Sequence, residues 1–267
     1  MPLRLGPTFA EALVAAERPL AGMWVCSGSP LVAEICAGSG LDWLLVDAEH
    51  SPNGLESILA QLQAVHGYPV QVLVRPPVND TVLIKQYLDL GVQNLLIPMV
   101  NTVADARAAV AATRYPPEGV RGVGSALARA ARWNRIPDYL ATAGGTVSVT
   151  VQIESTAAVE AVEDILAVDG VDAIFLGPSD LAASMGLLGQ QEHAQVRTAV
   201  GNCLHAAALA GKPAGVNAFT PTTARHYLES GASFVLVGAD VSLLARGSEA
   251  LATAYLPAPE DDSPSSY

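Results

Sequence analysis

Eight short apolar runs recur along this 267-residue chain, and the longer segments between them space their apolar residues as helices do. WLLVD, QVLVR, NLLIP and FVLVG are examples of runs with consecutive apolar residues. Such runs are typical of a parallel sheet covered on both faces, because both faces of each strand are then buried. The expected strands span residues 23–26, 43–47, 70–75, 94–98, 147–154, 173–177, 214–217 and 234–238.

The intervening segments carry helix signals. Ser51, Pro52 and Asn53 suit the start of a helix, and Gly91 and Gly211 suit C-terminal caps. Strands that alternate with helices over a chain of about 250 residues predict a single-domain (β/α)8 barrel, with a doubly wound open sheet as the second choice. The expected helices span residues 53–65, 81–90, 103–113, 157–167, 192–210 and 222–230.

We expect the barrel to occupy residues 1–256. Residues 257–267, with the sequence PAPEDDSPSSY, are rich in proline, serine and acidic residues and are expected to form a disordered acidic tail. The stretch 114–139 is long and mixed in character, which favours an extended functional loop.

Composition excludes several classes of partner. The net charge of −12 argues against nucleic acid and anionic membranes as partners.

Three cysteines without paired spacing give neither a disulfide framework nor a zinc site. The N-terminus does not read as a signal peptide, and no apolar run is long enough to span a membrane, so we expect a cytoplasmic protein. Sparse charge, at 15% of residues, indicates that other subunits cover part of the exterior.

Polar side chains follow several of the expected strands. In a (β/α)8 barrel the chemistry lies at the carboxyl ends of the strands, so these side chains should converge on one mouth. They are Asp47, Glu49 and His50 after the second strand, Arg75 after the third, Gln152 and Glu154 after the fifth, Ser179 and Asp180 after the sixth, and Asp240 after the eighth.

Two of these carboxylates suggest a metal site. Glu154 and Asp180 come from neighbouring strands, and carboxylates without sulfur ligands suit Mg²⁺ or Mn²⁺. The alternative is that each carboxylate caps a helix or pairs with an arginine. Ser179 and Asp180 could also open a helix whose backbone N–H groups hold a substrate carboxylate.

Arg75 and His50 are candidates for the chemistry. Arg75 could stabilise an enolate or a carboxylate, although a structural ion pair is the alternative. His50 could act as a general acid or base. The chain has two lysines, Lys85 and Lys212, and neither closes an expected strand, which argues against a Schiff base.

Several stretches together resemble one known family: WLLVDAEHSPN, VRPPVND, IKQYLDLG, LLIPMV, RYPPEGVRGVGSALARAARWNRIPDYL, VQIE and FLGPSDLAASMG. They closely resemble the 4-hydroxy-2-oxoheptanedioate aldolase family, which are class II pyruvate aldolases on a (β/α)8 barrel. The resemblance runs from about residue 8 to residue 255.

The resemblance implies a role for each matching residue. Glu154 and Asp180 would hold a divalent cation, Mg²⁺, Mn²⁺ or Co²⁺. Gln152 would contact the pyruvyl group, and the backbone amides of Ser179 and Asp180 would bind its carboxylate. Arg75 would stabilise the enolate.

His50, by the same resemblance, would remove the aldol hydroxyl proton. Asp89 matches the acid that raises the basicity of that histidine, presented across a subunit interface, and Asp47 is the local alternative. Family members form hexamers. Two positions depart from the family: Ser179 stands where relatives often carry alanine, and Asn217 stands where they often carry an apolar residue.

The expected activity is reversible, metal-dependent cleavage of 4-hydroxy-2-oxo acids, such as 4-hydroxy-2-oxoheptanedioate, to pyruvate and an aldehyde such as succinic semialdehyde, through a metal-bound enolate. The long match favours the aromatic-degradation branch over sugar-acid aldolases of the 2-keto-3-deoxy-glucarate or -rhamnonate type. A phosphoenolpyruvate-handling enzyme should carry more lysine, and a CoA-dependent lyase needs a basic surface. A non-catalytic barrel should have lost the polar residues of the mouth.

Overall fold

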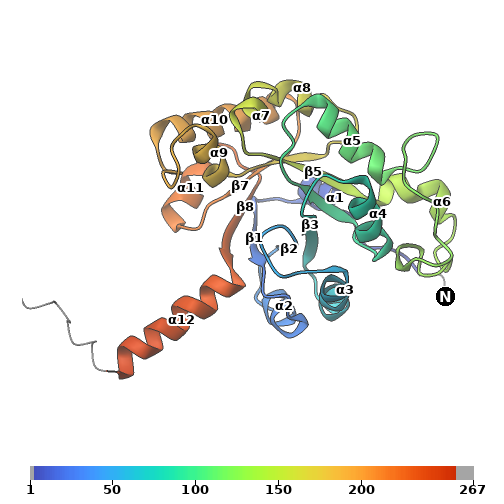
Figure 1. Ribbon diagram of the computed structural model, residues 1–267, viewed down its shortest axis with the longest axis horizontal. Helices are drawn as coiled ribbons and strands as arrows, with labels where there is room; N and C mark the ends of the chain where they lie inside the picture. Colours follow the sequence, from blue (N-terminus) through green and yellow to red (C-terminus); the bar gives the residue numbers. More distant parts are fainter. Residues whose placement is uncertain (1–2, 257–267) are drawn as a thin grey trace, which may run out of the picture.

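The computed structural model describes residues 3–256, which form a closed barrel of eight parallel strands in sequence order (Figure 1). The strands are β1 Leu20–Val25, β2 Trp43–Asp47, β3 Gln71–Arg75, β4 Asn94–Ile97, β5 Ser148–Ile153, β6 Ala173–Leu176, β7 Ala214–Asn217 and β8 Phe234–Ala239. The predicted (β/α)8 barrel is confirmed, and the open-sheet alternative is wrong because β8 pairs with β1. The expected tail, 257–267, lies outside the described residues.

More helices surround the barrel than the six expected. The expected helix 157–167 is two short helices that meet at Ala161. The helices are α1 Phe9–Ala15, α2 Pro30–Ala37, α3 Leu55–Ala64, α4 Thr81–Asp89, α5 Val103–Thr113, α6 Tyr139–Thr142, α7 Thr156–Glu160, α8 Val162–Leu166, α9 Pro178–Ser184, α10 Ala194–Leu209, α11 Pro221–Glu229 and α12 Asp240–Tyr255. Helices α1, α2, α6, α9 and α12 were not among the six, although Ser29 and Pro30 give α2 a good start.

Aromatic rings fill the end of the barrel at which the strands begin. Phe9 of α1 closes this end, and its ring meets that of Phe234 edge to face at 5.2 Å. Trp43 and Phe175 pack against the same cluster. These interior residues alternate along each strand with aliphatic side chains that face the helices, so both faces of the sheet are buried as the apolar runs predicted.

Gly215 of β7 leaves room for this cluster. A Cβ atom at Gly215 would lie 2.2 Å from the ring of Phe234, which is paired with it in register. We expect Gly215→Ala to lower the free energy of unfolding in urea by about 2 kcal/mol. The matched control is Gly201→Ala in α10, where a Cβ meets nothing within 4 Å; it should raise stability by about 0.5–1 kcal/mol. Equal stability of the two variants would contradict this packing.

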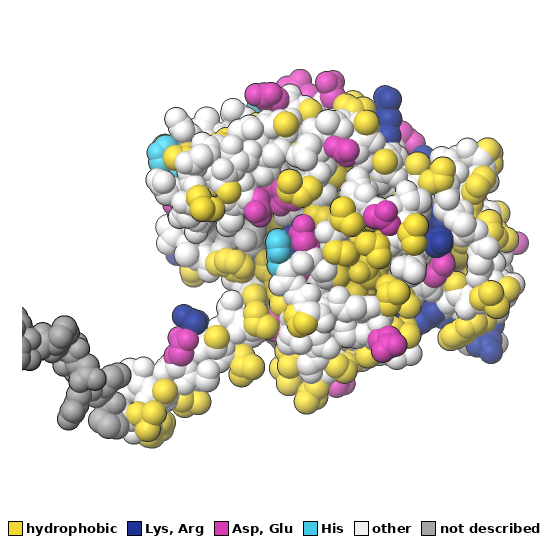
Figure 2. All heavy atoms as spheres, in the orientation of Figure 1, with side chains coloured by type: hydrophobic (Ala, Val, Ile, Leu, Met, Phe, Trp, Pro, Cys, Tyr) yellow, Lys and Arg dark blue, Asp and Glu magenta, His cyan; other side chains and the backbone are white. Residues whose placement is uncertain are grey.

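Helix α12 extends away from the barrel (Figures 1 and 2). Asp240, at its first turn, is its one buried residue. Large apolar side chains along the rest are exposed, among them Leu243, Leu244, Leu251 and Tyr255. No helix formed by residues 3–256 is long and apolar enough to cross a membrane.

Candidate active site

The predicted charged residues meet where β2 and β3 end. Asp47 and Arg75 are paired in the register of these strands, and Arg75 Nε donates a hydrogen bond to Asp47 Oδ1 at 2.8 Å. Their exposed fractions are 1% and 4%. An ion pair at this depth holds both side chains in one geometry.

Arg75 is fixed from further sides. Its Nη1 lies 2.7 Å from Glu49 Oε2 and 3.5 Å from Gln152 Oε1. Its guanidinium carbon lies 4.2 Å from the centre of the Trp24 ring. The planar fork is therefore oriented before any substrate arrives. Neither Glu49 nor Trp24 was predicted to hold Arg75, although Glu49 lies in the motif that contains Asp47 and His50.

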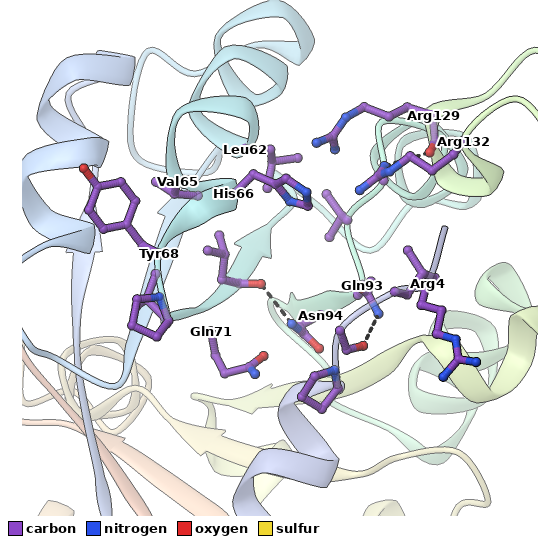
Figure 3. Close-up of a pocket in the computed structure, with 18 residues that line it drawn as sticks. Arg4, Leu62, Val65, His66, Tyr68, Gln71, Gln93, Asn94, Arg129 and Arg132 are labelled. Carbon is purple, nitrogen blue, oxygen red and sulfur yellow. Dashed lines mark hydrogen bonds between the residues drawn. The ribbon is translucent and has the colours of Figure 1, made fainter. Parts of the chain in front are cut away.

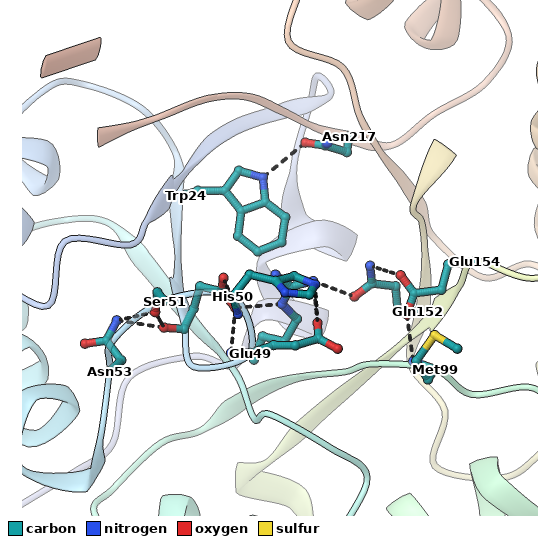
Figure 4. Close-up of polar contacts among 11 residues, drawn as sticks. Trp24, Glu49, His50, Ser51, Asn53, Met99, Gln152, Glu154 and Asn217 are labelled. Atoms are coloured by element: carbon teal, nitrogen blue, oxygen red, sulfur yellow. Dashed lines mark hydrogen bonds and ion pairs between the residues drawn. The ribbon is translucent and has the colours of Figure 1, made fainter. Parts of the chain in front are cut away.

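Glu154 lies directly after β5, beside Gln152 (Figure 4). Gln152 Nε2 donates to Glu154 Oε2, and the backbone N–H of Met99 donates to Oε1 at 2.8 Å. Met99 has a left-handed backbone with φ of 52°, which is uncommon for a residue with a side chain. No sequence signal pointed to Met99, because its contribution comes from its backbone.

Positive charge offsets the burial of the Glu154 carboxyl group only weakly, because Arg75 makes the smallest of the contributions to its pKa. Burial raises its pKa to about 7, and the negative charges of Asp180 and Glu49 add to the rise against the opposing Met99 hydrogen bond. Gly177 makes room for this group, since a Cβ there would come 2.9 Å from Glu154 Oε2.

These features fit a hard divalent cation between Glu154 and Asp180. The donors are oxygens, and a positive charge would reverse the unfavourable electrostatics of the buried acid. Within residues 3–256 no three His, Cys, Asp or Glu side chains are grouped as a metal site. A cation held here would therefore keep positions for water and substrate oxygens, as Mg²⁺ usually does.

Ser179 and Asp180 lie in the first turn of α9 and are exposed. The N-cap of this helix is Gly177, which provides no side-chain hydrogen bond. First-turn N–H groups have no partner inside a helix, so those of α9 can donate hydrogen bonds to an anion. Both residues border a cavity of about 260 Å³ that Arg75, Gln152 and His50 also line.

His50 stands at the edge of this cavity, and its side chain is 69% exposed. Its Nε2 lies 3.8 Å from Glu49 Oε2 (Figure 4). Asp47, the predicted local partner, instead accepts from the backbone N–H of His50 at 3.2 Å. Asp89 is away from this group at the end of α4, where Arg121 Nη2 approaches its Oδ1 at 3.3 Å. A pairing of Asp89 with the histidine of another subunit stays a prediction.

Other nucleophiles do not serve this site. Cys26 lines the cavity, but burial and the charges of Asp47 and Asp240 raise the pKa of its thiol to about 12. Lys212 donates to the carbonyl oxygens of Val168 and Val171 instead of lining the cavity.

Trp24 and Asn217 form a contact across the mouth that joins β1 to β7. Trp24 Nε1 donates to Asn217 Oδ1 at 3.1 Å (Figure 4). The sequence analysis singled out Asn217 as unusual for the family that the chain resembles. It did not predict the contact with Trp24, because the two residues lie 193 positions apart in the chain. Because Trp24 also stacks on Arg75, Asn217 contributes to the position of the arginine.

This chain is similar to known proteins in sequence and in structure. A family model described as HpcH/HpaI aldolase/citrate lyase matches residues 20–247. The hydroxypyruvate/pyruvate aldolase of Deinococcus radiodurans is 54% identical over 257 residues, which are 95% of this chain and 92% of that enzyme. The 4-hydroxy-2-oxo-heptane-1,7-dioate aldolase of Salmonella dublin is 53% identical, over 92% and 94%. A crystal structure of a Burkholderia cenocepacia J2315 protein of the same family superimposes with a TM-score of 0.88 at 40% identity, over 92% and 98%.

Proposed function

Since this chain belongs to the HpcH/HpaI aldolase/citrate lyase family and is an aldolase, we propose that it cleaves 4-hydroxy-2-oxo acids to pyruvate and an aldehyde with the help of a divalent cation. The observation that carries the proposal is the buried Glu154 carboxyl, short of positive charge, beside a rigidly held Arg75. We take 4-hydroxy-2-oxoheptanedioate, with succinic semialdehyde as its aldehyde product, as the reference substrate. The relative named for hydroxypyruvate makes that oxo acid a second candidate partner.

The metal would be held by Glu154 and Asp180, as Mg²⁺, Mn²⁺ or Co²⁺. Bound there, it supplies a Lewis acid for the keto group and an anchor for the oxo acid. The first-turn N–H groups of Ser179 and Asp180 receive the carboxylate of the substrate, and Gln152 borders its pyruvyl group.

The bond-breaking step is a retro-aldol cleavage. His50 accepts the proton of the C4 hydroxyl group as the C3–C4 bond breaks, and the aldehyde forms at C4. The bonding electron pair moves to the pyruvyl fragment as an enolate, whose developing charge faces Arg75. Protonation at C3 gives pyruvate. Glu49, between His50 and Arg75, orients both groups.

Metal dependence is the first test. The enzyme is stripped with EDTA, and pyruvate release from racemic 4-hydroxy-2-oxoheptanedioate is followed after adding Mg²⁺, Mn²⁺ or Co²⁺. We expect stripping to abolish activity and each restored ion to return it to a different extent. Full activity in the presence of EDTA would overturn the metal part of the proposal and leave the aldolase fold standing.

Asn217 should influence which aldehyde is accepted. We expect Asn217→Leu to free the indole of Trp24 and change the ratio of kcat/KM between succinic semialdehyde and acetaldehyde by about tenfold. Exchange of pyruvate methyl protons with D₂O, which needs no aldehyde, should change much less. An unchanged aldehyde ratio would remove Asn217 from the specificity site.

We also propose a homo-oligomer, a homohexamer by the family resemblance, as the working form. The apolar side chains exposed along α12 are suited to burial against another copy. Cys26, Cys36 and Cys203 are free thiols, which fits a cytoplasmic location. We also propose that the enzyme acts in the breakdown of aromatic compounds.

A further inference from the structure

Figure 3 shows a second cavity, of about 420 Å³. It borders the starts of β3 and β4, at Gln71 and Asn94, whereas the active site lies at the strands' carboxyl ends. Its volume falls in the range of small-molecule sites. Neither the family comparison nor the aldol reaction gives this cavity a role.

Positive charge gathers around this cavity without a carboxylate among the lining residues. Arg4, Arg129 and Arg132 line it, together with His66. None of the ion pairs within residues 3–256 involves these three arginines. In a chain with 14 lysines and arginines and a net charge of −12, this grouping is unusual.

Arg129 and Arg132 are held close to each other over Gly91. A Cβ at Gly91 would meet Arg129 Nη1 at 2.8 Å and Arg132 Nη1 at 3.1 Å, so both cations approach the same point. Burial, and then the charge of Arg132, lower the pKa of the Arg129 guanidinium. Both side chains reach toward His66 from the other side of the cavity (Figure 3).

Each guanidinium keeps donors for a ligand. Arg129 Nη1 donates to the carbonyl of Leu90, and Arg132 Nη1 donates to that of Arg129, both at 2.8 Å. A guanidinium has five N–H donors, and neither side chain is among the buried groups without partners. The remaining donors therefore face solvent in the cavity, where an anion can reach them.

The backbone that presents Arg132 is strained. Arg132, Trp133 and Asn134 all have positive φ, between 49° and 61°. Successive left-handed residues with side chains are unfavourable, and such strain is concentrated at functional sites. These residues belong to the long loop 114–139 that the sequence marked as functional, yet they lie away from the aldol chemistry.

We propose that this cavity is a binding site for a phosphate group, carried by a small organic phosphate, with Arg129 and Arg132 as its principal ligands. Two adjacent guanidiniums match the charge and the oxygen geometry of a dianionic phosphate, whereas a monocarboxylate would leave one cation unbalanced. Leu62, Val65 and Val92 give the cavity an apolar wall for the organic part.

The test measures binding of inorganic phosphate and of glycerol 3-phosphate by calorimetry at constant ionic strength. We expect both to bind wild-type enzyme, and Arg129→Gln and Arg132→Gln each to weaken binding by about tenfold or more. Arg107→Gln removes the same charge from the exposed face of α5 and should change nothing. Arg75→Lys, which alters the active site, should also leave this binding intact.

A measurement on the wild-type enzyme guards against variants that fold poorly. Phosphate should protect Arg129 and Arg132 from phenylglyoxal, as mapped by peptide mass spectrometry. Tighter binding of glycerol 3-phosphate than of inorganic phosphate supports an organic ligand, and equal affinity would replace it with free phosphate. No phosphate binding, acetate binding as tight as that of phosphate, or binding lost in Arg75→Lys but kept in the Arg129 and Arg132 variants would overturn the site.

Discussion

Replacing Arg75 by lysine is expected to lower kcat for aldol cleavage by about two to three orders of magnitude, with a much smaller effect on KM. Lysine keeps the charge but has no planar fork, so it cannot hold Asp47 and Glu49 together and still face the enolate. The contacts to Trp24 and Gln152 would also be lost.

Two readouts separate this role from a structural one. Exchange of the methyl protons of pyruvate with D₂O reports enolate formation alone, and it should fall in parallel with cleavage. Arg107→Lys is the control, since its side chain is exposed on α5. A drop in kcat of less than about threefold, or a change confined to KM, would mean that Arg75 binds the substrate without stabilising the transition state.

Glu154→Gln should remove activity almost completely and weaken binding of the activating metal by at least about tenfold. Glutamine keeps the size of the side chain, so the hydrogen bond from Met99 can persist, but the ligand charge is gone. Titration of EDTA-stripped enzyme with Mn²⁺, followed by paramagnetic resonance, measures the loss directly. A variant that binds Mn²⁺ as tightly as wild type would disprove Glu154 as a ligand.

The pKa of Glu154 gives this prediction a pH dependence. With a pKa of about 7, the carboxyl is protonated in acid, and the proton competes with the metal. Apparent metal affinity should therefore rise with pH up to about 7 and then level off.

The stability of the metal-free protein should change in the opposite direction. The unfolded chain releases the Glu154 proton near 4.5, whereas the folded chain retains it up to about 7. Stability should thus fall between these pH values by at most about 3 kcal/mol and stay level above them. Urea unfolding of EDTA-treated enzyme at pH 5 and pH 8 measures the fall, and Glu154→Gln should lack this part of it.

Much of the barrel follows from local sequence. The expected limits of β2 and β7 match the structure, because consecutive apolar residues end sharply at Asp47 and Asn217. Helix α12 was missed as an element, and most of its large apolar side chains are exposed instead of packed on the barrel. The break at Ala161 shortens an expected helix without any proline or glycine to announce it.

The sequence predicted those residues of the site that lie at the carboxyl ends of strands. Asp47, Arg75, Gln152 and Glu154 meet because parallel strands bring their carboxyl ends together. The bond from Trp24 to Asn217 depends on barrel closure, and the contribution of Met99 depends on a backbone angle. The residue types around Trp24, Asn217 and Met99 do not predict either feature.

Gly177 has an evolutionary consequence for the mouth of the barrel. Its bare backbone forms the wall behind Glu154, so nearly any substitution there would displace the acid and disable the enzyme. Asn217, at the end of the neighbouring strand β7, meets Trp24 through one hydrogen bond between side chains, and other residues can take its place. The position of Gly177 is thus closed to substitution, while the position beside it at Asn217 can change, so new aldehyde preferences can arise without loss of the reaction.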